Sequence, residues 1–88
     1  MKLNGEFVIR QITDEILAVP IGPTALKFNG MIMLNQVSKL IWNCLEQDTD
    51  LNSLTAAVTE HFEVSEETAR ADIQIFLQQL REVDLLIE

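Results

Sequence analysis

The hydrophobic pattern of this chain changes its period once, from strand-like in the first third to helix-like in the remainder. Residues 7–12 and 16–21 are short runs rich in β-branched and apolar side chains, which is typical of strands. From Asn35 onward, apolar residues recur three and four positions apart, as one face of an amphipathic helix requires. Strands that precede helices without alternating with them predict an α+β fold.

Three strands are predicted, and turn-forming residues separate them. Thr13–Glu15 folds the first two runs into a hairpin, and Pro20, which has no N–H for a ladder, indicates that the second strand ends nearby. The tight-turn pair Asn29-Gly30 introduces a third strand over Met31–Leu34, which Leu26–Phe28 could pair with locally.

Three side chains suited to N-capping mark the starts of three helices. Asn35 begins a helix that is expected to run to about Gln47, Asp50 begins a second one, and Ser65 begins the longest. The sequence therefore predicts one domain over residues 1–88, with a three-stranded antiparallel sheet followed by three helices in a winged helix-turn-helix arrangement.

The charge balance restricts the partners of such a domain. The chain has 6 basic and 14 acidic residues and a net charge of -8, which repels nucleic-acid phosphates and anionic lipid. Its basic residues are also dispersed rather than clustered. We expect neither nucleic acid nor membrane as a partner.

Few residues in the sequence suggest catalysis or metal binding. His61, the single histidine, has no Cys or carboxylate in ligand spacing, and Cys44 lies on the apolar stripe of its helix. Three glycines do not make a phosphate loop. We expect no enzyme, no metal and no other cofactor. One cysteine and no signal-like apolar run favour a cytoplasmic protein.

The third predicted strand is the first candidate for a binding surface. Met31–Leu34 is apolar on both faces, whereas a strand packed on one side alternates. Either Met31 and Met33 are only covered by the long helix, or their flexible thioethers line a peptide groove. Ile75 lies off the main stripe of the third helix and could form a second wall. An open edge on this strand would accept a peptide as an added strand.

Two stretches resemble the PqqD-like family of peptide-recognition elements. Leu34-Asn35 leads into a helix with Ile41-Trp42, and Ala71-Asp72 precedes Phe76-Leu77. The resemblance extends from about Phe7 to Ile87. It departs at Asp84, where members of the family often have a glycine that ends the last helix, so the course of the C-terminal residues is open.

The resemblance implies that the chain binds the leader segment of a ribosomally made precursor peptide, which pairs with the third strand, rests against the third helix and is presented to a modifying enzyme such as a radical S-adenosylmethionine maturase. Carried over by position, the peptide-binding residues are Met31, Ile32, Met33, Leu34, Asp72, Ile73, Ile75, Phe76 and Gln79.

The same pattern is also compatible with two other hypotheses. A winged helix-turn-helix can be a DNA-binding regulator, although the third helix carries only Arg70 and Arg81 among several acids. The chain could also be a self-associating adaptor, in which the open strand edge forms a homodimer.

Overall fold

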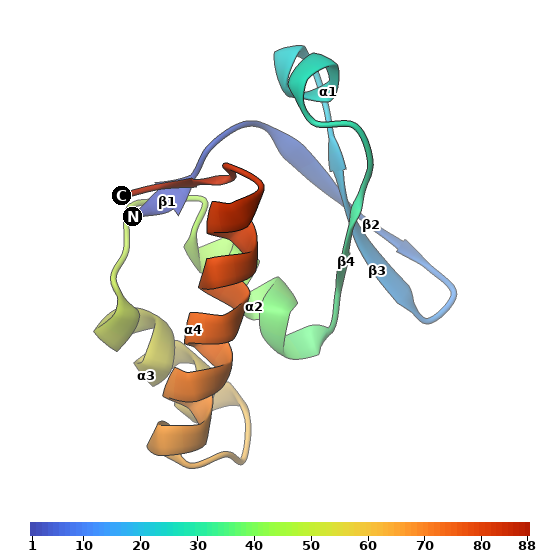
Figure 1. The fold of residues 1–88 in the computed structure, drawn as a ribbon. Helices are drawn as coiled ribbons and strands as arrows, with labels where there is room; N and C mark the ends of the chain where they lie inside the picture. Colours follow the sequence, from blue (N-terminus) through green and yellow to red (C-terminus); the bar gives the residue numbers. More distant parts are fainter.

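The computed structural model describes all residues, 1–88, and places a small sheet on one side of a group of helices (Figure 1). The sheet is antiparallel, with strand order β2-β3-β4. Its strands are β2 (Phe7–Ile12), β3 (Glu15–Pro20) and β4 (Ile32–Leu34). The longer helices are α2 (Gln36–Cys44), α3 (Leu51–His61) and α4 (Glu66–Glu82). The predicted α+β winged helix-turn-helix class, with its three-stranded antiparallel sheet, is confirmed.

The β2–β3 hairpin forms as its sequence predicts. Ile12 pairs with Glu15, so Thr13 and Asp14 make the turn, and Thr13 has a positive φ of 56°. The second strand ends at Pro20, as expected from its missing N–H. β3 then pairs with β4, and Ile16 lies opposite Leu34.

A short helix, α1 (Pro23–Lys27), lies between the hairpin and β4, where local strand pairing by Leu26–Phe28 was an expectation. That expectation is wrong. Pro23 occupies the first turn, where its fixed φ suits a helix and its missing N–H breaks no bond. The amide of Phe28 then closes the turn by donating to the carbonyl of Thr24 at 2.8 Å.

The three predicted N-caps are confirmed. The side chains of Asn35, Asp50 and Ser65 accept hydrogen bonds from the amides three residues ahead, at the starts of α2, α3 and α4. The expected end of the first long helix at Gln47 is wrong, because α2 stops at Cys44. The amide of Leu45 is shared between the carbonyls of Ile41 and Trp42, and the amides of Glu46 and Gln47 bond three residues back instead of four, which turns the chain toward α3.

The core lies between the helices and the inner face of the sheet. Trp42 of α2 is almost completely buried, and Phe7 of β2 packs against it edge to face, with ring centroids 5.1 Å apart. From α4, the side chains of Ala69, Ile73, Leu77 and Leu80 enter the same core. The sheet is therefore fixed to α2 and α4, which places β4 beside α4.

A second, two-stranded sheet joins the two ends of the chain. It pairs β1 (Lys2–Leu3) with β5 (Leu86–Ile87), and the prediction of a single sheet and three helices lacked both it and α1. The chain reaches β5 through Asp84, which has a φ of 59°. None of the helices combines the length and the apolar composition that a bilayer span requires.

Candidate functional site

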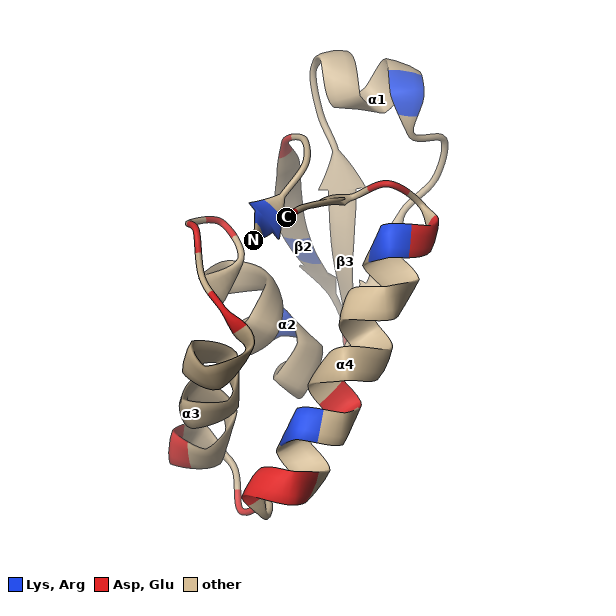
Figure 2. Ribbon diagram, turned by 60° about the vertical axis from the view of Figure 1, so that its left-hand side comes forward, with Lys and Arg blue, Asp and Glu red and all other residues tan.

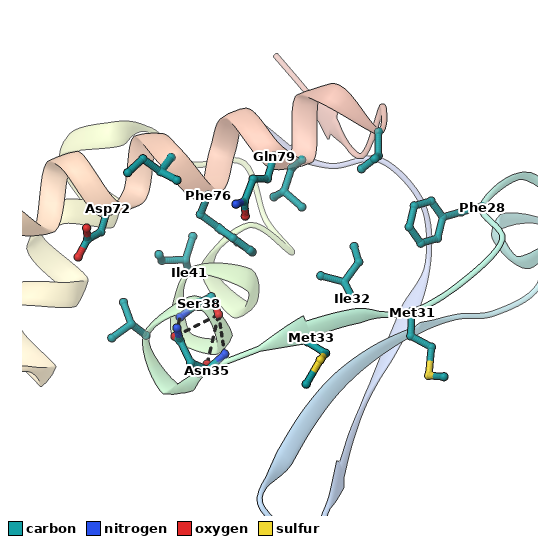
Figure 3. A pocket seen from close by; sticks show the side chains of 14 residues that line it. Phe28, Met31, Ile32, Met33, Asn35, Ser38, Ile41, Asp72, Phe76 and Gln79 are labelled. Atoms are coloured by element: carbon teal, nitrogen blue, oxygen red, sulfur yellow. Dashed lines mark hydrogen bonds between the residues drawn. The ribbon is translucent and has the colours of Figure 1, made fainter.

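A groove runs between β4, the start of α2 and α4 (Figure 3). Its volume is about 630 Å³, and ten of its fourteen lining residues are hydrophobic. The lining residues are Phe28, Met31, Ile32, Met33, Asn35, Val37, Ser38, Ile41, Asp72, Ile75, Phe76, Gln79, Leu80 and Val83. A groove of this size and apolar character suits side chains of a ligand larger than a single residue.

One wall of the groove is a strand with a free edge. β4 is the last strand of its sheet, with β3 on one side and no strand on the other. None of the hydrogen bonds outside the helices and strands involves residues 29–34. Because a strand directs half of its amides and carbonyls to each side, the outward half of β4 is open to another extended chain.

The side chains of β4 alternate between two faces. Ile32 points toward α4, whereas Met31 and Met33 point to the opposite side of the strand (Figure 3). Both methionines are exposed, at 61% and 68%, so α4 does not cover them. Both methionines line the groove. The apolar side chain of β4 that lies beneath α4, however, is that of Ile32.

The other wall is one face of α4. Asp72, Phe76 and Gln79 lie four and three residues apart, and their side chains extend from the same side of the helix (Figure 3). Ile75 lies beside them and is 60% exposed. The flank of α4 that the sequence singled out is therefore a wall of the groove.

Two of the residues expected in the groove lie in the core instead. Leu34 pairs with Ile16 on the inner face of the sheet, and Ile73 is fully buried on the inner stripe of α4. Neither residue lines the groove. They support its walls from behind, Leu34 from β4 and Ile73 from α4.

Several lining residues were not predicted. Val37, Ser38 and Ile41 come from α2, which directly follows β4, so the groove floor could have been inferred from that short connection. Phe28 lies at the end of the groove near Met31 (Figure 3), and Val83 also lines the groove. Phe28 follows the unpredicted helix α1, and no local signal marked it.

The groove is nearly free of charge. Asp72 is the one charged residue that lines it, and no ion pair or hydrogen bond engages its carboxylate. The two arginines of α4 have partners elsewhere: Arg70 contacts Glu66 and Asn52, and Arg81 binds Glu88 at 2.7 Å.

The basic residues do not form a patch for nucleic acid. Figure 2 shows Lys and Arg at separate places on several elements, and on α4 acidic residues lie beside the basic ones. A DNA-binding face would gather positive charge on one helix or groove. The charge distribution therefore does not support the hypothesis of a DNA-binding regulator.

The reactive side chains lie away from the groove. Burial raises the pKa of the Cys44 thiol, which lowers its thiolate fraction at neutral pH. Nδ1 of His61 lies 2.9 Å from the carbonyl oxygen of Ala57, within its own helix. No group of three or more His, Cys, Asp or Glu residues is placed to hold a metal ion.

Comparison with known proteins identifies a shared fold and a family. A solved structure described as "TbiB1 in Complex with the TbiA(beta) Leader Peptide" has the same fold, with a TM-score of 0.72 and 24% sequence identity. The match covers 98% of this chain and 94% of that chain. No curated protein matches the chain significantly.

A family model assigns the chain more directly. The model described as "Coenzyme PQQ synthesis protein D (PqqD)" matches residues 21–86, which include β4, all three long helices and every lining residue of the groove. This chain belongs to the PqqD family.

Proposed function

We propose that this protein binds the leader segment of a ribosomally synthesised precursor peptide and presents it to a modifying enzyme, without carrying out chemistry itself. The leader adds to the open edge of β4 as a further strand, and alternate side chains enter the groove beneath α4. The observation that carries this proposal is the combination of a free strand edge with an apolar groove directly beside it.

The two walls would contribute different parts of the binding. Hydrogen bonds to the β4 backbone are independent of sequence and supply affinity, whereas the groove selects side chains by size and polarity. The proposed peptide-binding residues are Met31, Ile32, Met33, Asp72, Ile75, Phe76 and Gln79, with Leu34 and Ile73 as the support behind them.

Membership of the PqqD family and the leader complex of the TbiB1 structure support the same function. A leader is made in the cytoplasm, so the proposed function places the protein there with its modifying enzyme, such as a radical S-adenosylmethionine maturase. No cofactor is needed for such a role.

Amide NMR shifts test the proposal. The isotopically labelled protein is titrated with a synthetic leader from a precursor gene beside its own. We expect shifts at residues 31–35 and along Asp72–Val83, with little change in α3. Shifts confined to α3 and the β1–β5 sheet would contradict the groove.

A matched pair of variants separates binding from folding. Ile75→Asp places a charge in the groove wall, while Leu26→Asp makes the same change at an exposed site on α1 that is 91% accessible. Both side chains are exposed, so both variants should fold. We expect at least a tenfold loss of leader affinity for Ile75→Asp, equivalent to about 1.4 kcal/mol, and none for Leu26→Asp.

The open edge also suits pairing with a second copy of the chain, which is the adaptor reading. Light scattering across a range of protein concentrations distinguishes the two uses. A monomer that binds the leader supports the proposal, and a dimer that the leader does not dissociate favours the adaptor.

A further inference from the structure

We propose that Asp72 selects leaders with a lysine or arginine two residues before the apolar side chain that fills the groove. This inference rests on the proposed function and adds a substrate class to it. In the groove, the carboxylate of Asp72 is the one charged group among apolar and uncharged polar groups.

Asp72 has no structural role in α4 that would explain an aspartate at this position. Glu66 and Glu67 lie in the first turn of α4, where the helix dipole stabilises negative charge, but Asp72 is well past that turn. Aspartate is a poor helix former in such an interior position. Its carboxylate forms no ion pair with any of the basic residues of the chain.

The groove also has a direction. Asp72 lies at the end where β4 leads through Asn35 into α2, and Phe28 and Met31 lie at the other end (Figure 3). β4 and α4 therefore run in opposite directions. A peptide that continues the antiparallel order of the sheet runs with α4, so its amino-terminal side lies at Asp72.

The spacing follows from the two backbones. Four residues of an α-helix advance about 6 Å, and two residues of a strand advance about 6.6 Å. Side chains two apart on the peptide therefore face Asp72 and Phe76 in turn, and a third faces Gln79 and Val83. The expected pattern is a basic residue, any residue, an apolar residue, any residue and a second apolar residue.

Partial removal of water strengthens the expected ion pair. The carboxylate lies on the rim of an apolar groove, and the arriving peptide would cover one side of it. An ammonium or guanidinium group there gains a charge-assisted hydrogen bond, whereas an acidic side chain meets repulsion. Asp72 would thereby fix the position and the direction of the peptide.

Selection from an mRNA-displayed library of random 12-residue peptides tests this inference. The wild-type protein should enrich Lys or Arg two positions before an apolar residue. Asp72→Lys should replace that preference with Asp or Glu, and Asp72→Asn should remove it. Glu60→Lys makes the same charge change at an exposed site on α3 outside the groove, and it should keep the wild-type preference.

The result is then confirmed with one selected peptide. Asp72→Asn should weaken its binding about three- to tenfold, and replacing the basic residue of the peptide by glutamine should have the same effect. Combining the two changes should add little further loss, because they remove one interaction.

The outcomes separate this inference from the proposed function. Peptides that bind at the groove by NMR, but with the same charge preference for wild type and Asp72→Lys, overturn the role of Asp72 and leave the groove intact. Failure of every selected peptide to shift the β4 and α4 amides overturns both.

Discussion

Asn35 and Ser38 bind each other's backbone at the junction between β4 and α2. The amide of Ser38 donates to Oδ1 of Asn35 at 2.8 Å, and the amide of Asn35 donates to Oγ of Ser38 at 2.8 Å. This reciprocal cap satisfies two amides that the helix itself cannot. It also sets the angle between the strand and the helix that form two sides of the groove.

Loss of this cap should reduce stability by a measurable amount. Asn35→Ala is expected to lower the free energy of unfolding by about 0.5–2 kcal/mol, because a helix N-cap is removed. Urea denaturation followed by circular dichroism measures the change. Asn43→Ala, at an exposed position within α2, serves as the control and should stay within about 0.5 kcal/mol of wild type.

A substitution at the end of α4 should have the opposite effect and raise the stability of the fold. The amide of Leu85 donates to the carbonyl of Leu80, and that of Asp84 to Arg81, with Asp84 in the left-handed region at φ 59°. A glycine adopts this conformation with less strain. Asp84→Gly should therefore raise the free energy of unfolding by about 0.5–1 kcal/mol.

Asp84→Ala separates strain from lost contacts, since alanine tolerates the left-handed region less well than aspartate. It should unfold at lower urea concentration than wild type. A stability of Asp84→Gly below that of wild type would show that the contacts of the Asp84 side chain outweigh the strain of its backbone conformation.

The two-stranded sheet at the chain ends should depend on burial rather than on charge. Leu86 of β5 is buried, whereas the pair of Arg81 with Glu88 is exposed. Leu86→Ala should cost about 2–4 kcal/mol, and Glu88→Gln less than about 1 kcal/mol. Equal losses in urea denaturation would mean that the ion pair contributes as much to stability as the burial of Leu86.

The N-cap of α3 should make stability sensitive to acid. Hydrogen bonds from Ser53, chiefly from its backbone amide, lower the pKa of Asp50 below its ordinary value. A carboxylate whose pKa is lower in the folded state stabilises fully above the unfolded pKa, and this contribution disappears as the pH falls through the folded pKa. Wild type should therefore lose stability below about pH 4.

Asp50→Asn isolates this effect, because asparagine caps a helix about as well and has no charge to lose. Between neutral pH and about pH 3, the urea midpoint of Asp50→Asn should fall less than that of wild type. An identical fall for both proteins would assign the acid sensitivity to other carboxylates.

Features of the fold that depend on neighbouring residues were predictable from the sequence. The N-caps at Asn35, Asp50 and Ser65 and the end of β3 at Pro20 each follow from the chemistry of one side chain and its neighbours. The pairing of Leu3 with Leu86 joins the two ends of the chain through two-residue strands. Such short strands have no period to detect.

The part of the site that lies on one flank of α4 was predictable from the spacing of residues along that helix. Asp72, Ile75 and Gln79 share a flank of α4 that does not face the core, and all three line the groove. Leu34 and Ile73 were placed there by position, from the family resemblance, yet strand and helix geometry turn their side chains inward. Phe28 enters from the far end of α1, which only the folded chain brings close.

The length of β4 limits what can join its sheet. With three residues, the strand offers few outward amides and carbonyls, so an edge from another folded domain would gain little by pairing with it. A flexible chain that also fills the space beneath α4 gains apolar burial in addition to those few bonds. The short strand thus disfavours fibre-like stacking of this acidic domain. It still allows binding of the few extended partners whose side chains fit the groove.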